Sequence, residues 1–133
     1  MNKNLYNSLL NKYPNQFRSI KHIECGDGWF DILEKACGLI EWHIDTKNKK
    51  GSDIDFHWLQ IKEKFGYMRA YHSGGDDYIY GVVSMLESIS SIICEYSGEK
   101  GRLRKQRIDD NGQQIPAWIK TLSDIEAQKE RYV

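Results

Sequence analysis

The sequence predicts an α+β fold: a single small domain in which helices pack on short antiparallel β-hairpins. Two observations lead to this class. The predicted elements follow the order helix, helix, hairpin, helix, hairpin, helix, which favours small antiparallel pairings over a parallel sheet. With 133 residues the chain can bury a core without disulfides or a structural metal. We expect a helix–helix–hairpin–helix core over 1–98, followed by a basic hairpin and a C-terminal helix over 99–133.

Two helices are predicted before the first hairpin. Apolar residues near helical spacing over 4–13 precede Pro14, which predicts a short helix there. A glycine on each side of Asp27 then breaks the chain, and Asp27 is expected to cap a second helix that runs to about Asp45. A polar, basic loop over 46–52 follows. The second helix carries one broad apolar stripe at steps of three and four residues, formed by Trp29, Leu33, Ala36, Ile40 and Ile44.

Aromatic and β-branched residues crowd the next segment, and a turn containing Gly66 divides it. This pattern predicts a β-hairpin with strands near 56–62 and 67–72. Side chains two residues apart on a strand share a face. One face of the second strand is therefore expected to carry Tyr67, Arg69 and Tyr71.

A third helix and a second hairpin complete the prediction. Asp76 or Asp77 is expected to cap a helix that runs to about Tyr96. The segment Asp109 to Gly112 is a strong hairpin turn signal. Ser123, with a glutamate three residues later, predicts a capping box for a last, polar helix.

Composition limits the classes of function. Lysine and arginine total 19, as do aspartate and glutamate, so the chain is formally neutral. That balance argues against coating nucleic acid through bulk charge, although a local basic patch remains open. No apolar run is long enough to span a membrane, and no signal peptide is recognisable, so a cytoplasmic protein is expected. The three cysteines form no C-x-x-C pair, which predicts free thiols without a disulfide framework or a complete zinc site.

No catalytic signature is present, and the acid–base candidates have ordinary alternatives. His57 and His72 could meet across the first hairpin as a metal or acid–base pair, or be two part-exposed histidines. Asp76 and Asp77 could be paired carboxylates of an enzyme, or simply the start of a helix. We expect no catalytic residue, no metal and no cofactor.

The face that carries Tyr67, Arg69 and Tyr71 is the more informative pattern. Alternating aromatic and guanidinium groups can stack on a base and pair with a phosphate, but the same pattern describes the solvent face of a two-stranded sheet. The cations between Lys100 and Arg107 could contact nucleic acid or an acidic protein, or form a solvated hairpin beside neighbouring acids.

Two longer runs carry a family resemblance. Glu24 to Leu33 contains a GDGWF turn, and Gln60 to Tyr71 contains the hairpin sequence QIKEKFGYMRAY. Together they resemble a widespread group of small uncharacterised phage and prophage proteins. In that group a GDGW turn precedes a VKEKFG-LRFY hairpin, a serine-rich helix and a tail of the form C-x-x-C-G-x-x-G-x-L-R. The resemblance covers about residues 20 to 126.

The chain departs from that family at its cysteines. Cys94 stands at the first position, whereas Ser97 and Ser123 replace the second and third, and Glu126 lies near the fourth. A zinc ribbon needs four thiolate or imidazole ligands, so the resemblance implies that this chain has lost the metal. For function, the resemblance implies a biological context but no specific chemistry. Small phage proteins of this kind commonly act by binding a host defence protein or a nucleotide signal.

The leading hypothesis is therefore a counter-defence protein of phage or prophage origin that captures a host protein or a nucleotide second messenger stoichiometrically, as a monomer or as a homo-oligomer. The alternatives are a nucleic-acid-binding module that uses the basic tail hairpin, and a small metal-dependent or acid–base enzyme. Lys62 and Lys64 lie one strand period apart and are expected to share a face. The candidate binding residues are Trp29, Lys62, Lys64, Arg69, Tyr71, Arg102 and Arg104.

Overall fold

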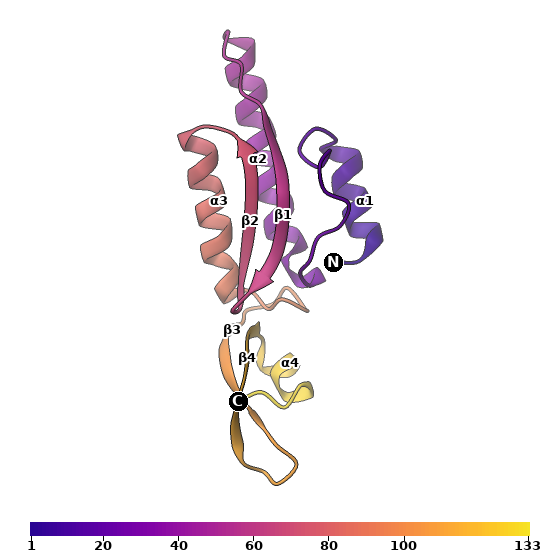
Figure 1. The fold of residues 1–133 in the computed structure, drawn as a ribbon, viewed down its shortest axis with the longest axis vertical. Coiled ribbons are helices and arrows are strands. Elements are labelled where there is room, and N and C mark those ends of the chain that lie inside the picture. The colour runs from indigo at the N-terminus through magenta and orange to yellow at the C-terminus, as the bar shows by residue number, and fades with distance from the viewer.

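The computed structural model describes residues 1–133 as an elongated molecule (Figure 1), with a larger part above and a smaller hairpin part below. Its four helices and two separate antiparallel pairs of strands confirm the predicted α+β class. The elements are α1 (Lys3–Lys12), η1 (Asp27–Trp29), α2 (Phe30–Lys49), β1 (Phe56–Lys64), β2 (Tyr67–Gly74), α3 (Asp77–Ile89), η2 (Ser90–Ile92), β3 (Arg102–Ile108), β4 (Gln114–Leu122) and α4 (Asp124–Lys129).

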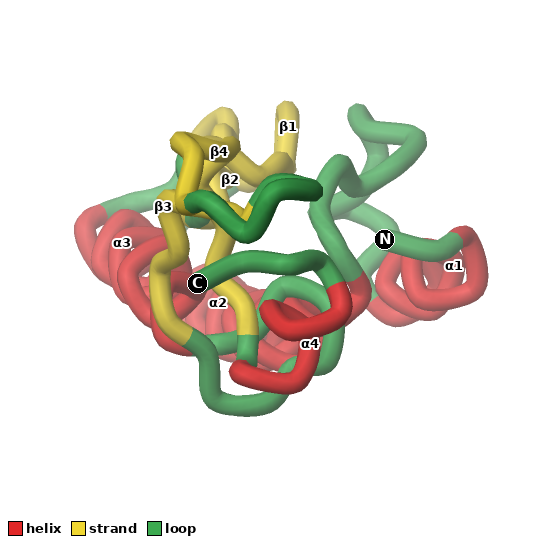
Figure 2. Tube along the Cα trace, turned by 90° about the horizontal axis from the view of Figure 1, so that it is seen from below, coloured by secondary structure: helices red, strands yellow, loops and turns green.

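The larger part has two layers. The hairpin β1–β2 forms one layer and the helices form the other, with α2 behind the strands, α3 on one side and α1 on the other (Figure 1). Seen from below, the strands lie above α2 and α3, and one face of the hairpin is left uncovered by helices (Figure 2). The predicted hairpin is confirmed, with each strand two residues longer than expected.

A bulge in β1 decides which side chains reach that uncovered face. Register shifts between Trp58 and Gln60, so Leu59 is the extra residue of the strand. Trp58 before the bulge and Ile61 after it are both buried, although they are three residues apart. Without the bulge Lys62 would point to the same side as Trp58. The bulge therefore turns Lys62 and Lys64 to the outer face.

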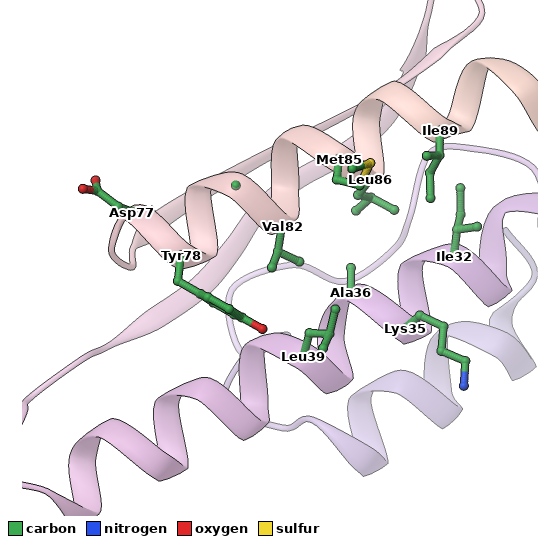
Figure 3. Close-up of a pocket in the computed structure, with 11 residues that line it drawn as sticks. Ile32, Lys35, Ala36, Leu39, Asp77, Tyr78, Val82, Met85, Leu86 and Ile89 are labelled. Carbon is green, nitrogen blue, oxygen red and sulfur yellow. The ribbon is translucent and has the colours of Figure 1, made fainter.

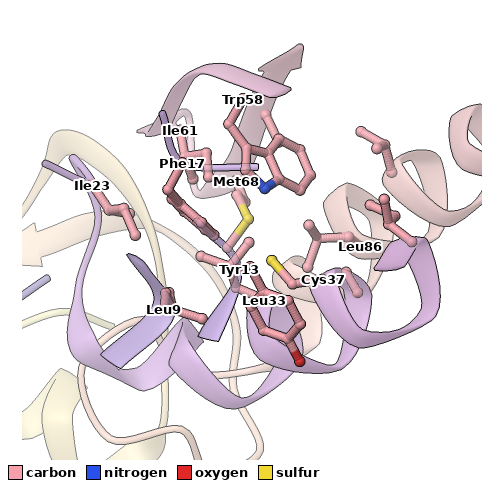
Figure 4. Packing of buried hydrophobic residues seen from close by; sticks show 14 of the residues in the cluster. Leu9, Tyr13, Phe17, Ile23, Leu33, Cys37, Trp58, Ile61, Met68 and Leu86 are labelled. Atoms are coloured by element: carbon pink, nitrogen blue, oxygen red, sulfur yellow. The ribbon is translucent and has the colours of Figure 1, made fainter. Parts of the chain in front are cut away.

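The main core fills the space between hairpin and helices. It contains 19 buried residues, and Figure 4 shows Trp58, Ile61 and Met68 of the hairpin meeting Leu33 of α2 and Phe17 of the turn segment after α1. Each large apolar side chain so buried contributes about 2 kcal/mol to stability. A second, small cluster lies under the other hairpin and comprises Cys94, Leu122, Ala127 and Tyr132.

The second hairpin is docked on the turn of the first. The Thr121 hydroxyl donates a hydrogen bond to the Gly66 carbonyl at 2.7 Å. Gly66 has φ +81°, and a Cβ there would lie 2.5 Å from Leu103 Cδ2, so the contact requires glycine. The predicted second hairpin is confirmed, as is the Ser123 cap, whose Oγ accepts from the Glu126 amide.

The start and end of α2 differ from the prediction. Asp27 does not cap this helix, because its carboxylate accepts instead from the backbone and side-chain amides of Asn2, at 2.6 and 3.0 Å. The helix runs to Lys49 rather than to about Asp45, so part of the expected basic loop is helical. The Asn48 side chain then exchanges two hydrogen bonds with the Ile54 backbone, which closes the following loop.

The third helix is shorter than predicted. Asp76 caps it as expected, its carboxylate accepting from the Ile79 amide. The α-helix ends at Ile89 instead of near Tyr96 and continues as η2, where the Ser90 hydroxyl donates to the Glu87 carbonyl and accepts from the Met68 amide. The following residues leave the helix and pack against η1, where the Gly28 amide donates to the Glu95 carbonyl.

Candidate ligand-binding surface

Four of the seven predicted binding residues come together on the uncovered face of β1–β2. In the strand register Lys62 lies opposite Arg69, and Lys64 lies opposite Tyr67. Tyr71 pairs with Gln60, one step further along the same face. The buried partners Met68 and Ala70 point the other way, into the core, as the alternation of a strand requires. Tyr67, Arg69 and Tyr71 thus share a face, as the sequence predicted.

Two cations on this face each lie beside an aromatic ring. The Lys62 ammonium lies 5.8 Å from the centre of the Tyr71 ring, and the Arg69 guanidinium carbon lies 5.4 Å from the centre of the Tyr67 ring. Both distances are within the range of cation–π attraction. The two tyrosines are four positions apart on β2, which corresponds to about 13 Å along the strand.

The hairpin turn continues these contacts toward the second hairpin. The Lys64 ammonium lies 5.7 Å from the centre of the Phe65 ring. Phe65 in turn stacks on Trp118 of β4, with ring centres 5.5 Å apart and planes at 27°. Phe65 and Trp118 are 49% and 56% exposed, so these are open rings rather than core residues. We call the resulting path the aromatic–basic strip; it comprises Tyr71, Lys62, Arg69, Tyr67, Lys64, Phe65 and Trp118.

The three cations of the strip have no carboxylate oxygen within 4.0 Å. None of the seven ion pairs in the structure uses one of its three cations. Two carboxylates on or beside β1 have other partners. Glu63 accepts from the Gly66 amide and from Trp118 Nε1, and Glu24 approaches His22 and Gln60. The arrangement therefore offers cations to an anion and exposed rings to a flat group, at adjacent positions.

Three predicted binding residues do not join the strip. Trp29 is completely buried, and its Nε1 donates to the Ile93 carbonyl, so it is a core residue and the prediction of a binding role is wrong. Arg104 is also buried, where it binds the Leu122 carbonyl and the Asp124 carboxylate, so its role is structural. Arg102 is exposed, but it lies on the second hairpin, where it lines a small cavity together with Lys100 and Asp124.

The acid–base candidates do not converge. In the strand register His57 lies opposite Ser73, whereas His72 lies opposite Trp58, so the two histidines occupy opposite faces. His57 meets the Arg18 guanidinium at 2.9 Å, and His72 packs on aromatic rings. The hypothesis that they form a metal or acid–base pair is therefore wrong. Asp77 is exposed and Asp76 caps α3, so these carboxylates do not form a pair either.

Asp76 has a partner that the sequence did not indicate. The buried His43 of α2 lies with Nε2 2.7 Å from Asp76 Oδ2, and its ring stacks on Tyr78 at 4.1 Å. Hydrogen bonding to His43 lowers the pKa of Asp76. No serine or cysteine hydrogen-bonds to His43, so the pair lacks the nucleophile of a catalytic triad. It joins α2 to the start of α3. The sequence indicates this pair only weakly, because His43 is a single polar residue beside the apolar stripe of α2.

The cysteines are free and buried. Burial raises the pKa of Cys25 to about 12 and also raises the pKa of Cys37. For Cys94 burial acts in the same direction, but hydrogen bonds from Ser97 and from the Ser123 backbone outweigh it and lower the pKa. Cys94, Ser97 and Ser123, which the resemblance would place at zinc-ribbon positions, thus lie together. One thiol and two hydroxyls do not make the ligand set of a structural zinc site.

The geometry defines a class: a small α+β protein with an open, cationic and aromatic sheet face. None of its helices combines the length and the apolar character that crossing a bilayer requires. Compared with protein-family models, with curated proteins and with solved structures, the chain matches none.

Proposed function

We propose that this chain is a stoichiometric nucleotide-binding protein that captures single-stranded nucleic acid on the aromatic–basic strip. In the setting implied by the phage and prophage resemblance, it would act against a bacterial defence system by occupying a strand or a nucleotide signal without turnover. The observation that carries the proposal is the row of three cation–ring contacts on the outer face of β1–β2 and its turn, which the stacking of Phe65 on Trp118 extends to the second hairpin.

The chemistry of the path matches the two parts of a nucleotide. A base presents a flat π surface that stacks on an aromatic ring, which contributes about 1–3 kcal/mol per base. A phosphate is attracted by an adjacent lysine or arginine, and the guanidinium of Arg69 can hold two phosphate oxygens at once. Each of the three cations lies beside a ring, so a phosphate and a neighbouring base could be held together at three successive places.

The openness of the strip favours a strand over a single small nucleotide. A pocket for a small molecule surrounds most of its ligand. The cavities of 560 and 780 Å³ are lined by residues of α2, α3 and the loop before α3, and none of them belongs to the strip. A flat face binds weakly at each position but gains with each successive base, which suits an extended ligand.

A direct test is fluorescence anisotropy with labelled oligothymidine and oligouridine of about eight nucleotides. We expect dissociation constants on the order of 1–10 µM at low salt. Three cations predict a slope of about −2 for log affinity against log salt on a single strand. A blunt duplex of the same length and a cyclic dinucleotide serve as the competing ligands, since the first hides its bases and the second is the small-signal alternative.

Variants then locate the site. Tyr71→Ala and Arg69→Gln should each weaken binding by about tenfold, because each removes one base or phosphate contact. Lys105→Glu changes an exposed cation of β3 outside the strip and is the matched control. Arg102→Glu tests the tail hairpin, the site of the earlier alternative.

Each outcome separates the candidates. Loss of binding with Arg102→Glu, but not with the strip variants, would move the site to the tail. Tight binding of the cyclic dinucleotide alone would favour a small signal. No binding of any of these ligands at about 100 µM and low salt would refute a nucleotide ligand, and would leave a host protein, for which Trp, Tyr and Arg are common interface anchors, as the partner.

A further inference from the structure

A small polar cavity lies on the second hairpin, outside the aromatic–basic strip. Its volume is 310 Å³, and none of its lining residues is hydrophobic; they are Lys100, Gly101, Arg102, Arg104 and Asp124. The groove of 560 Å³ between α2 and α3 differs in character, because eight of its eleven lining residues are hydrophobic (Figure 3). The polar cavity is therefore lined by groups that bind a charged ligand, and it shares no residue with the strip.

The three cations of the polar cavity lie on one side of the chain. Lys100, Arg102 and Arg104 are two positions apart, and side chains at that spacing share a side of an extended segment. Gly101 lets this segment run close to Cys94, because a Cβ at Gly101 would lie 2.9 Å from the backbone nitrogen of Cys94. The spacing and the close backbone packing together hold the three cations beside one cavity.

Arg104 forms the buried wall of the polar cavity. Its side chain is 5% exposed, and its Nε and Nη2 groups donate to the Leu122 carbonyl and to the Asp124 carboxylate. These two bonds fix the plane of the guanidinium, whereas Nη1 makes no hydrogen bond within the chain. The structural role of Arg104 thus leaves a donor in a fixed position, and a guanidinium held in this way loses little side-chain freedom when it binds an anion.

The charges that line the polar cavity do not balance. Asp124 is its one carboxylate, and the hydrogen bond from Arg104, together with the positive charges of Arg104 and Arg102, lowers the pKa of Asp124. Both guanidinium groups are therefore close to the same carboxylate. Lys100 and Arg102 form no ion pair, either with Asp124 or with the neighbouring Glu99. Three cations facing one carboxylate leave two positive charges without a counter-charge in the lining.

We infer that the polar cavity binds a phosphate dianion, which is either inorganic phosphate or the terminal phosphate of a phosphomonoester. Such a group carries about two negative charges at neutral pH and three terminal oxygens. It matches the two unbalanced positive charges and the donors of three side chains. A carboxylate or a phosphodiester offers one charge and two such oxygens. The inference does not depend on what the strip binds.

A heteronuclear NMR titration of the isotope-labelled full chain tests the site. Inorganic phosphate is added at about pH 7.5, where it is mostly dianionic, with the ionic strength held constant by sodium chloride. We expect a dissociation constant on the order of 0.1–1 mM, both for phosphate and for ribose 5-phosphate, which carries a terminal phosphate but no base. Dimethyl phosphate, a monoanionic diester, should bind about tenfold more weakly. The largest shifts are expected at the Gly101 and Arg102 amides and at the Arg104 Nε–H.

Variants of the lining locate the site and give effects of opposite sign. Arg102→Gln and Lys100→Gln each remove one cation and should weaken phosphate binding about fivefold. Asp124→Asn removes the carboxylate that repels an anion and occupies Arg104, so it should strengthen binding about threefold. Lys105→Gln removes an exposed cation of β3 outside the cavity and is the matched control.

Arg69→Gln separates this site from the strip, because it should leave phosphate binding at the polar cavity unchanged. Thermal melting without phosphate verifies that each variant keeps its fold, as expected for exposed positions. No saturable shift up to about 20 mM phosphate would overturn the inference. Equal affinity for dimethyl phosphate would overturn it too, since that result means a general attraction to anions. A loss of affinity in Asp124→Asn, or an equal loss in Lys105→Gln and Arg102→Gln, would also contradict it.

Discussion

Lys62 lies directly opposite Arg69 on the outer face of β1–β2, and neither cation has a carboxylate partner. Like charges directly across a strand pair destabilise it, so this face is not arranged for stability. The pair has a use if an anion binds between the two side chains.

Lys62→Glu separates stability from binding. It replaces the cation pair with a cross-strand ion pair, so we expect the free energy of unfolding to rise by about 0.5 kcal/mol. The same change should weaken oligonucleotide binding by tenfold or more, because it reverses one phosphate-binding charge. Urea unfolding and anisotropy on one preparation measure both effects. If stability and affinity fall together, Lys62 has a structural role instead.

Arg104 and Arg102 should behave differently although they are neighbours on β3. Arg104→Ala removes buried hydrogen bonds to the Leu122 carbonyl and the Asp124 carboxylate, so we expect a loss of about 2 kcal/mol. Arg102→Ala changes an exposed side chain and should alter stability by less than about 0.5 kcal/mol. Chemical denaturation compares them. Equal effects would contradict the assignment of Arg104 to the core.

Glu95 makes stability depend on pH. The side chain is buried, Oε2 has no hydrogen-bond partner, and burial raises its pKa above the ordinary value of 4.5. A raised folded pKa means that the contribution of this group to stability is complete below pH 4.5 and is lost as the pH rises through the folded value. Glu95→Gln, which stays neutral, should therefore stabilise the protein at pH 7 by about 1 kcal/mol, with the gain disappearing near pH 4.

Thermal melting of wild type and Glu95→Gln between pH 4 and 8 measures this difference. The Gly26 amide, which donates to Oε1, can keep its acceptor in the variant, so the local geometry is retained. A gain that is the same at every pH would show that the carboxylate charge is not its cause.

Asp76 acts in the opposite direction. Its lowered pKa means that its contribution is present above about pH 3.8 and is lost as the pH falls through the folded value. Asp76→Ala removes both the α3 cap and the His43 contact, and should cost about 1–2 kcal/mol near pH 6. Asp76→Asn keeps the cap and should cost less. If the two variants lose equal stability in urea unfolding, the cap contributes little, and the loss comes from the contact of the carboxylate with His43.

The site around Cys94 offers a test of the family resemblance. Cys94 and Ser97, and likewise Ser123 and Glu126, are spaced as two C-x-x-C pairs, and Ser97 and Ser123 both contact the Cys94 thiol. The triple variant Ser97→Cys, Ser123→Cys and Glu126→Cys should bind Co²⁺ or Zn²⁺ with four thiolates, which the visible absorption of tetrahedral Co²⁺ reports. Ser97→Ala with Ser123→Ala is the control. A folded triple variant that binds no metal would argue against a zinc-ribbon relationship.

Local patterns were sufficient for much of the fold. The two hairpins, the Asp76 and Ser123 caps and the shared face of Tyr67, Arg69 and Tyr71 follow from turn chemistry, capping and strand alternation, all of which act over a few residues. Predictions that depended on distant partners failed. Asp27 binds Asn2 instead of capping α2, and Trp29 enters the core although its pattern also suited an exposed anchor.

The sequence by itself determined the α+β class and the residue types that could bind a nucleotide, because composition and short-range periodicity carry that information. Only the tertiary structure decided which of them meet. The Leu59 bulge turns Lys62 outward, and docking of β4 on the first hairpin brings Trp118 onto Phe65, 53 positions earlier in the chain. The bulge and the docking of β4 both depend on long-range packing, in which burying apolar surface outweighs local preference. A short sequence pattern therefore cannot predict either of them.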